Sequence, residues 1–492
     1  MPVKPLLLEL QQSSRRQPLC IAHRGASAHR LENTLEAFQL AARMNADFWE
    51  LDVWRSADGI CVVSHDNHLR HATGQDIGID ALSYEQLQQY PLANGEQLPS
   101  LAAVIELAIR TDSGLYIELK DPGSGPEVVR LLQTARFEKA IIAGFDADAI
   151  AMLADQACPY PLAVMVAVSE DPLIKAATAQ ADIVHLCWEK ADRHPHQRVT
   201  ETLLRQAQEQ QLAVVLWHEE RPAELAHLLT LPVLAICTNN PELMNTYQPD
   251  PANAIAICCH RGAHRIAPEN TLPAAELGLC MGAQVIELDL HTSLDGQLMV
   301  IHDSTLDRTT NLMGPVSDYT ARQLAECDAG SWFHQDYQSA GIPLFSDYLH
   351  LIQRYQRQLF VELKQVDVDQ VISEVSNHSL LESCFFWSFN SDYLDQIQHR
   401  YPQARVMRRR QDFPDLETLL ASGTPAVVEY DYRIDDLTEM DRCRARGAQV
   451  MIRFFADRIE DALPVIELRP DLVNLDDPFL FQRAYQQWLN RQ

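Results

Sequence analysis

The chain of 492 residues has little positive charge and no long apolar run. It carries 40 Lys and Arg against 68 Asp and Glu, a net charge of −28 at pH 7. Nucleic acids and anionic membranes bind positively charged surfaces, so this balance argues against both as partners. No stretch is apolar enough to span a membrane, and the segment from Met1 to Cys20 lacks the features of a signal peptide. We therefore expect a cytoplasmic protein with no integral membrane segment.

The cysteines also exclude some classes of protein. There are eleven of them, and none forms the C-x-x-C pair that is typical of zinc sites. Many lie in apolar, strand-like runs: Cys20, Cys61, Cys187, Cys237, Cys258, Cys259 and Cys384. An odd number at such positions predicts buried thiols in a reducing compartment rather than a disulfide framework.

What the sequence does contain is a series of polar motifs that occurs twice. The first half carries His23-Arg24-Gly25, Glu32-Asn33-Thr34, Glu50-Leu51-Asp52, Asp58-Gly59 and His65-Asp66. The second half repeats it as His260-Arg261-Gly262, Glu269-Asn270-Thr271, Glu287-Leu288-Asp289, Asp295-Gly296 and His302-Asp303, at a constant offset of 237 residues (260 − 23). A later pair, Glu118-Leu119-Lys120 and Glu362-Leu363-Lys364, is offset by 244 residues (362 − 118). The repeat indicates a tandem duplication.

Each half alternates short apolar runs with amphipathic helical patterns. We count eight predicted strands between Leu19 and Thr238 and eight between Ala256 and Leu475. This rhythm is typical of βα units, and eight units predict a (β/α)8 barrel of the TIM type in each half. We place the domains at residues 1–248 and 253–492, joined by a short proline-containing linker from Tyr247 to Asn253.

One segment of each half leaves no room for a helix. Asp58-Gly59 stands between two apolar runs and predicts a hairpin that returns His65 to the side of Leu51 and Asp52. Asp295-Gly296 predicts the same return for His302. Residues 305–343, which contain Trp332, Phe333 and Tyr337, are longer than the matching region of the first half. We expect these regions to form a small cap at each barrel mouth.

The repeated carboxylates predict a metal site. Glu50 and Asp52 face the same side of a strand, and Glu118 brings a third carboxylate from the next barrel strand. Buried carboxylates repel one another unless a cation neutralises them. An all-oxygen set suits Mg²⁺ or Ca²⁺ better than zinc. The plainer interpretation is an ion-pair network with Arg24 and Lys120. It is less favoured because the second half repeats the three acids as Glu287, Asp289 and Glu362.

The remaining motif residues fit proton transfer and phosphate binding. His23 with His65, and His260 with His302, are candidate acid and base pairs. Arg24, Lys120, Arg261 and Lys364 are candidate ligands of a phosphate oxygen. Four further residues either support these groups or cap the helix that starts near Thr34 and its counterpart: Glu32, Asn33, Glu269 and Asn270.

Taken in this order, the motifs resemble those of the glycerophosphodiester phosphodiesterases, over nearly the whole chain and twice. The resemblance implies a barrel enzyme that uses a divalent metal to hydrolyse a small glycerophosphodiester to glycerol 3-phosphate and an alcohol. It assigns the metal to Glu50, Asp52 and Glu118, and to Glu287, Asp289 and Glu362. The nucleophile, water or the glycerol 2-hydroxyl, stays open, and so does the direction of proton transfer. We favour His23 and His260 as bases and His65 and His302 as acids.

The two halves also differ. Arg30-Leu31 stands where the second half has Ala267-Pro268, and Trp217 on the seventh strand is matched to Ile452. We expect such positions to shape the alcohol pocket. Two other interpretations stay open: a related barrel phosphodiesterase of the lysophospholipase D or phospholipase C type, and a non-catalytic partner role for one half.

Overall fold

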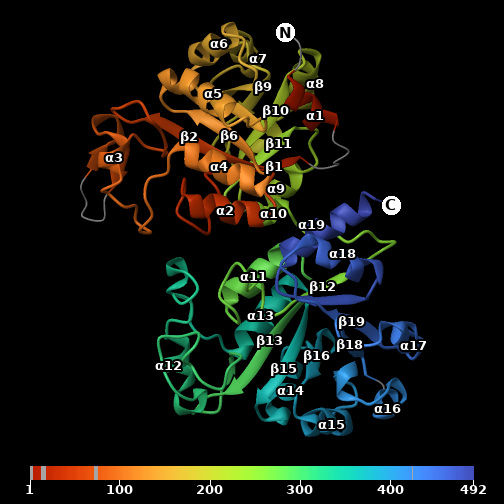
Figure 1. Ribbon diagram of the computed structural model, residues 1–492. Helices are drawn as coiled ribbons and strands as arrows, with labels where there is room; N and C mark the ends of the chain where they lie inside the picture. Colours follow the sequence, from red (N-terminus) through yellow and green to blue (C-terminus); the bar gives the residue numbers. More distant parts are fainter. Residues whose placement is uncertain (1–3, 13–17, 71–75, 424, 492) are drawn as a thin grey trace. The chain divides into compact units, whose positions relative to one another are not determined.

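The computed structural model describes residues 4–12, 18–70, 76–423 and 425–491. The chain divides into two compact units, Met1–Asn245 and Thr246–Gln492. Each unit is a closed barrel of eight parallel strands with helices between them (Figure 1). The predicted tandem barrels are confirmed.

In the first unit the barrel closes because β1 pairs with β2 on one side and with β11 on the other. Most residues of these strands are apolar and buried, since the barrel interior covers one face and the helices cover the other. The strands are β1 (Leu19–His23), β2 (Phe48–Arg55), β6 (Gly114–Leu119), β7 (Ala140–Gly144), β8 (Leu162–Val166), β9 (Ile183–Leu186), β10 (Ala213–His218) and β11 (Ala235–Thr238). The helices are α1 (Pro5–Gln12), α2 (Leu35–Arg43), α3 (Tyr84–Leu87), α4 (Leu101–Thr111), α5 (Gly125–Thr134), α6 (Ala147–Asp155), α7 (Pro172–Ala179), α8 (Glu201–Glu209), α9 (Pro222–Leu228) and α10 (Pro241–Met244).

The second unit repeats this closure, with β12 between β13 and β20. Its strands are β12 (Ala256–Cys259), β13 (Val285–Thr292), β15 (Gln358–Gln365), β16 (Cys384–Trp387), β17 (Arg405–Arg409), β18 (Val427–Asp431), β19 (Gln449–Arg453) and β20 (Leu472–Leu475). Its helices are α11 (Leu272–Cys280), α12 (Ala321–Ala325), α13 (Phe345–Tyr355), α14 (Val368–Asn377), α15 (Ser391–Arg400), α16 (Leu416–Ala421), α17 (Met440–Ala445), α18 (Ile459–Glu467) and α19 (Pro478–Leu489).

Both predicted hairpins are present. Strand β3 (Cys61–Val63) pairs back on β2, and the backbone N–H of Ser64 donates to the carbonyl of Asp52 at 3.0 Å. Strand β14 (Leu298–Val300) pairs back on β13, and Ile301 donates to Asp289 at 3.0 Å. Each hairpin therefore returns the residue before its second histidine to the central aspartate of the carboxylate motif.

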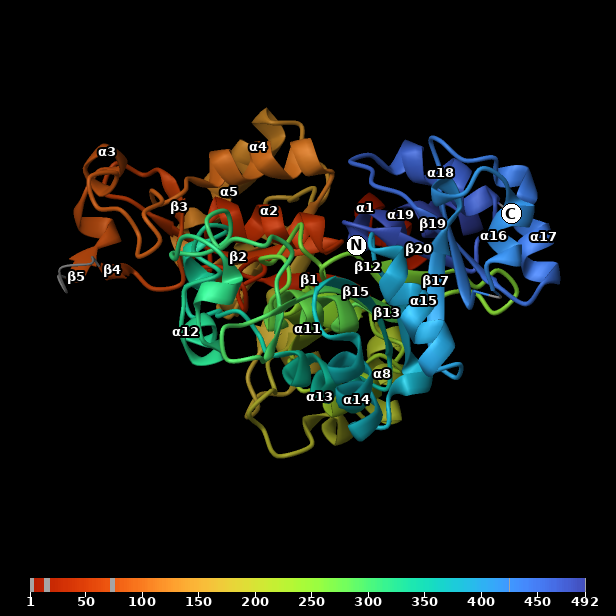
Figure 2. The same ribbon diagram turned by 90° about the horizontal axis from the view of Figure 1, so that it is seen from below.

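After each hairpin the chain builds a small cap with its own apolar core. In the first unit the cap contains α3, β4 (His68–Arg70) and β5 (Asp76–Gly78), and both views show these elements standing to one side of the barrel strands (Figures 1 and 2). In the second unit α12 lies in the cap, whose core includes Leu306, Leu324 and Ile342. The longer cap belongs to the second unit, as the sequence predicts.

The segment expected to be a linker is partly packed. Tyr247 is 2% exposed, and its hydroxyl donates to the carbonyl of Ile255 at 2.7 Å. The backbone N–H of Asp250 donates to the hydroxyl of Tyr485 at 3.0 Å. These bonds attach the start of the segment to the second barrel. The domain limits at 248 and 253 stay a prediction.

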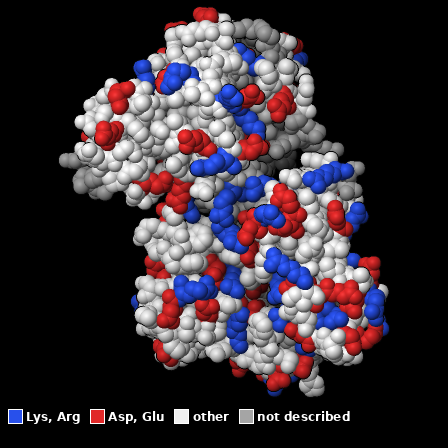
Figure 3. All heavy atoms as spheres, viewed as in Figure 1, with Lys and Arg blue, Asp and Glu red and all other residues white. Residues whose placement is uncertain are grey.

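All eleven cysteines are free thiols, and all but Cys187 and Cys280 are buried. Burial raises the pKa of several of them, including Cys61 to about 12, because an apolar interior disfavours the thiolate. No helix among the described residues has the length and apolar character to cross a membrane. On the face drawn in Figure 3, basic and acidic side chains are interspersed.

Candidate active sites

Three carboxylates lie together in the first barrel. Glu50 and Asp52 point to the same side of β2, and the strand register places Glu118 of β6 beside Asp52. None of them is more than 5% exposed. One carboxylate oxygen from each residue lies within 4.8 Å of the others. The structure therefore brings together the three acids that the sequence singles out as metal ligands.

The second barrel repeats the cluster. Glu287 and Asp289 lie on β13, and the register pairs Asp289 with Glu362 of β15. Their carboxylate oxygens also lie within 4.8 Å of one another. The duplication has thus kept the charge arrangement as well as the motifs.

Such a cluster is unfavourable without a cation. Burial, and then the charges of Asp52 and Glu118, raise the pKa of Glu50 well above its usual range. Burial also raises the pKa of Glu118 to about 7. In the second barrel burial and the neighbouring carboxylates raise the pKa of Glu287 in the same way, and the pKa of Glu362 rises to about 7. A divalent cation would remove this repulsion.

One oxygen of each central aspartate gives a further test of fit. Oδ1 of Asp52 and Oδ1 of Asp289 are buried, and no described group donates a well-aligned hydrogen bond to either. Lys120 Nζ lies 3.3 Å from the first and Lys364 Nζ 3.1 Å from the second. A buried carboxylate oxygen among other carboxylates fits a hard cation such as Mg²⁺ or Ca²⁺.

The loop after the first strand presents the arginine. Arg24 and Gly25 have left-handed backbones, with φ of 56° and 84°. A Cβ on Gly25 would lie 2.7 Å from the carbonyl carbon of Ala37, so this loop can pack on α2 only with glycine there. The turn lets the backbone N–H of Arg24 donate to Glu50 Oε2 at 3.0 Å, and Arg261 makes the matching bond at 2.7 Å.

Glu32 and Asn33 support the cluster in different ways. Glu32 accepts hydrogen bonds from the guanidinium of Arg24 at 3.0 Å, whereas Asn33 donates to Asp52 Oδ2 at 2.8 Å. The cap of α2 is Thr34, so neither residue caps the helix. The same bonds recur in the second barrel, where Glu269 accepts from Arg261 at 3.0 Å and Asn270 donates to Asp289 at 2.8 Å.

The two motif lysines, Lys120 and Lys364, pair with the carboxylates of their own clusters. Lys120 Nζ lies 2.8 Å from Glu118 Oε1, in addition to its contact with Asp52. Lys364 pairs with Glu362 and Asp289 in the same way. Both ammonium groups therefore lie in contact with the carboxylate clusters.

The first histidine of each site is held by a residue that the sequence analysis missed. Nδ1 of His23 lies 2.7 Å from Asn239 Oδ1, and Nδ1 of His260 lies 2.9 Å from Asp476 Oδ1. The two partners follow the eighth strand and are themselves 237 residues apart (476 − 239). Extending the repeat to the end of each barrel would have found them.

The neighbours of these histidines also differ between the barrels. The ring of His218 stacks on His23 at 4.5 Å, whereas Phe455 stacks on His260 at 4.9 Å. Burial, and then the charges of Arg24 and His218, lower the pKa of His23 to about 3. Burial also lowers the pKa of His260, but there its hydrogen bond to Asp476 opposes the shift.

The second histidine of each site has an acidic neighbour. His65 Nδ1 lies 3.0 Å from Asp66 Oδ1, and His302 Nδ1 lies 2.6 Å from Asp303 Oδ1. In the second barrel Arg308 connects Asp303, at 2.7 Å, to Glu269, at 2.7 and 2.8 Å. Hydrogen bonds from Arg308 and then His302 lower the pKa of Asp303 to about 2, so this carboxylate stays ionised.

An open cavity of about 570 Å³ adjoins the second site. It is lined by His302, Lys364 and Phe389, among others. The Phe389 side chain is 71% exposed and packs against Trp387 at 4.5 Å. The cavity therefore opens beside His302 and Lys364 and has an aromatic wall at Phe389.

The proposed match of Trp217 to Ile452 is wrong. The register pairs Leu216 with Ile236 and Ile452 with Val473, and Trp217 falls at an irregularity between Leu216 and His218. Trp217 is 1% exposed, so it belongs to the core and does not line an open pocket. The irregularity turns the next residue, His218, toward His23.

Barrels of this kind carry their active sites at the carboxyl ends of the strands, and carboxylates clustered there are typical of metal-assisted hydrolases. The chain belongs to the glycerophosphoryl diester phosphodiesterase family, whose sequence profile matches residues 23–243 and 260–454.

Individual relatives are similar to one barrel at a time. YhdW of Bacillus subtilis (strain 168) is 36% identical over 168 residues, which cover 33% of this chain and 63% of that protein. A glycerophosphodiester phosphodiesterase of the same organism is 32% identical over 207 residues, or 38% of this chain and 67% of the relative. The crystal structure of glycerophosphodiester phosphodiesterase from Agrobacterium tumefaciens str. C58 is 32% identical, with a TM-score of 0.44, and covers 47% of this chain and 100% of that one.

Proposed function

We propose that each barrel hydrolyses small glycerophosphodiesters to glycerol 3-phosphate and an alcohol, with Mg²⁺ or Ca²⁺ as cofactor. The observation that carries this proposal is the buried carboxylate cluster, which is present in both barrels. Membership of the family supports the substrate class. A cytoplasmic location stays a prediction of the sequence.

The metal would be held by Glu50, Asp52 and Glu118 in the first barrel. In the second barrel it would be held by Glu287, Asp289 and Glu362. When bound, it supplies positive charge to the non-bridging phosphate oxygens as negative charge builds in the transition state. Carboxylate ligands favour Mg²⁺ or Ca²⁺ over softer cations.

The four cations bind the phosphate. A guanidinium has five N–H donors and an ammonium three, so Arg24 and Lys120 keep donors for a phosphate oxygen beyond their carboxylate contacts. Arg261 and Lys364 are placed in the same way. A fork of guanidinium donors suits two oxygens of one phosphate.

The histidines transfer protons. The lowered pKa of His260 keeps this ring neutral near pH 7, with Nδ1 donating to Asp476, so Nε2 is available as a base. His302 Nδ1 lies 2.6 Å from Oδ1 of the ionised Asp303, which orients the ring so that its Nε2 can protonate the leaving alcohol. His23 and His65 take the corresponding roles in the first barrel. Glu269, Asn270, Glu32 and Asn33 hold these groups in position.

The test is an assay of released glycerol 3-phosphate on a panel of glycerophosphodiesters with different alcohols. We expect the wild-type protein to act on several of them with Mg²⁺ or Ca²⁺ present. The control is the double variant Glu50→Gln and Glu287→Gln, in which an amide oxygen still accepts the bond from the arginine backbone. A folded double variant as active as the wild type would contradict the proposal.

A further inference from the structure

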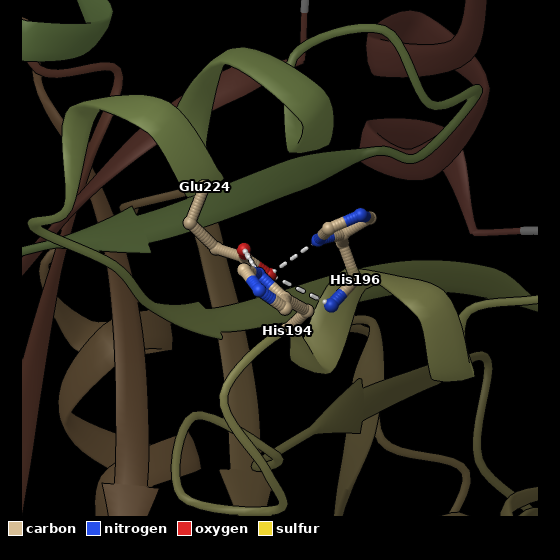
Figure 4. A group of neighbouring side chains, drawn as sticks. All are labelled: His194, His196 and Glu224. Carbon is tan, nitrogen blue, oxygen red and sulfur yellow. Dashed lines mark hydrogen bonds and ion pairs between the residues drawn. The ribbon is translucent and has the colours of Figure 1, made fainter.

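The first barrel carries a second group of metal-type side chains, which shares no residue with its carboxylate cluster. His194 and His196 lie in the segment 187–200 between β9 and α8, and Glu224 lies in the first turn of α9. Figure 4 shows the carboxylate of Glu224 between the two imidazole rings. These segments follow the sixth and seventh barrel strands, so the group lies on loops at the C-terminal end of the barrel.

The geometry of the group is that of a partial coordination shell. His196 Nδ1 lies 2.7 Å from Glu224 Oε1, and His194 Nδ1 lies 3.7 Å from Oε2. One nitrogen from each ring and one carboxylate oxygen all lie within 4.8 Å of one another. Tetrahedral zinc with bonds of about 2.0 Å needs ligand separations of about 3.3 Å, which small side-chain rotations would give.

The carboxylate of Glu224 is buried and already paired. It is 4% exposed, and a buried carboxylate is costly unless it is paired. The backbone N–H of His196 donates to its Oε1 at 2.8 Å, in addition to the contact of the His196 ring. The ring of His227, one turn further along α9, stacks on His196 at 4.4 Å and restricts its orientation.

The second barrel shows that this group is not part of the common barrel design. Its corresponding segment, residues 432–439 between β18 and α17, is shorter than residues 187–200. Asp461 stands where Glu224 stands relative to the helix start, and it accepts hydrogen bonds from Arg458 at 3.0 and 3.2 Å. In the first barrel the corresponding Arg221 donates from its Nε to Glu219 Oε1 at 2.7 Å, and not to Glu224.

We propose that His194, His196 and Glu224 bind a divalent transition cation of the zinc class. Two imidazoles and one carboxylate are a zinc ligand set with a fourth position for water, whereas Mg²⁺ and Ca²⁺ prefer oxygen ligands alone. The cation ties the segment 187–200 to α9. The site does not depend on the proposed hydrolytic function, because it shares no residue with the carboxylate clusters.

The test is titration of the metal-free full chain with Zn²⁺ by calorimetry, in an excess of Mg²⁺ that occupies the carboxylate clusters. We expect His194→Ala to weaken one zinc site by at least about 10-fold, and His194→Ala with His196→Ala to remove it. His194 is exposed, so its replacement leaves the fold intact. His350→Ala, which replaces an exposed histidine of the second barrel, is the control and should retain the site. An unchanged zinc stoichiometry and affinity in the double variant would overturn the proposal.

Trypsin gives a second measurement that does not depend on counting metal ions. Lys190 and Arg193 are exposed in the same segment. We expect Zn²⁺ to slow cleavage after these residues in the wild type but not in His194→Ala. Equal protection of both proteins would refute the claim that a cation bound by His194 holds the segment.

Discussion

The two barrels share their carboxylates but support the first histidine differently. In the second barrel His260 and His264 both contact Asp476, at 2.9 and 3.4 Å. In the first barrel an amide takes this place, because Asn239 contacts His23, and Ser27 donates to the same oxygen at 2.9 Å. A carboxylate stabilises the imidazolium that forms when a base takes a proton, and an amide does so far less. The duplication has thus kept the carboxylate cluster, whereas the residues that hold the first histidine have diverged.

The sites also differ in how firmly the loops are held. In the second barrel Arg308 joins the loop of Glu269 to the hairpin residue Asp303. The Glu269 side chain is 10% exposed, against 44% for Glu32 in the first barrel. A site whose groups are already in place loses less entropy in the transition state. We therefore expect the second barrel to be the faster enzyme on substrates that both accept.

Removal of the metal should abolish the difference in rate between the barrels, because both should lose activity. Thorough treatment with EDTA should lower hydrolysis of every diester by at least about 100-fold, because the transition-state charge loses its main stabilisation. Mg²⁺ or Ca²⁺ should restore activity better than Zn²⁺. Full activity in protein shown to be metal-free by elemental analysis would contradict the metal-dependent mechanism.

Exchanging the amide and the carboxylate should have the next largest effect. In a Glu50→Gln background, which isolates the second site, Asp476→Asn should lower kcat by at least about 10-fold because His260 becomes a weaker base. In a Glu287→Gln background, Asn239→Asp should raise the pKa of His23 from its low value. A base is inactive when protonated, so the acid limb of the kcat/KM profile should move to higher pH.

These pH profiles contain their own control, since each background reports a single site. If Asp476→Asn and its parent had the same kcat and the same acid limb, Asp476 would have no part in the function of His260.

Loosening the second site should have a moderate effect. Arg308→Lys keeps the charge but cannot bond Asp303 and Glu269 with one planar fork, so we expect kcat of the second site to fall about fivefold. Because Arg308 is about half exposed, thermal stability should change little. A kcat equal to that of the parent would show that the bridge is only structural.

The smallest expected effect concerns the alcohol. Phe389 in the second barrel and Phe145 in the first stand two residues after the strand residues that pair with Glu362 and Glu118. Phe389→Ala should change the relative rates on different alcohols at the second site by about threefold. The matched change Phe145→Ala should alter only the first site. If neither variant changed the relative rates on different alcohols, these two rings would not form part of the alcohol pocket.

Much of each site could be predicted because its motifs lie on neighbouring strands. Glu50 and Asp52 share a strand, the hairpin brings back His65, and the next strand supplies Glu118, so local rules are enough. Asn239 could not be found in this way, because only barrel closure brings the end of the last strand beside the first.

Other contacts depended on details that the sequence does not encode locally. The position of His218 depends on a strand irregularity that moved Trp217 into the core. Arg308 lies in the cap, so its contacts with Asp303 and Glu269 depend on how the cap folds. The group of His194, His196 and Glu224 joins two loops, one of which is longer than its counterpart in the second barrel.

The most direct test of two active sites is the pair of single variants Glu50→Gln and Glu287→Gln, assayed on the same panel of diesters. Each change removes one ligand from one barrel, so each variant should keep the activity of the other barrel. We expect Glu50→Gln to retain most of the activity and Glu287→Gln to retain a smaller part, with different preferences among the alcohols. Complete loss of activity on every diester in folded Glu287→Gln would contradict the account, because the first barrel would then have no active site.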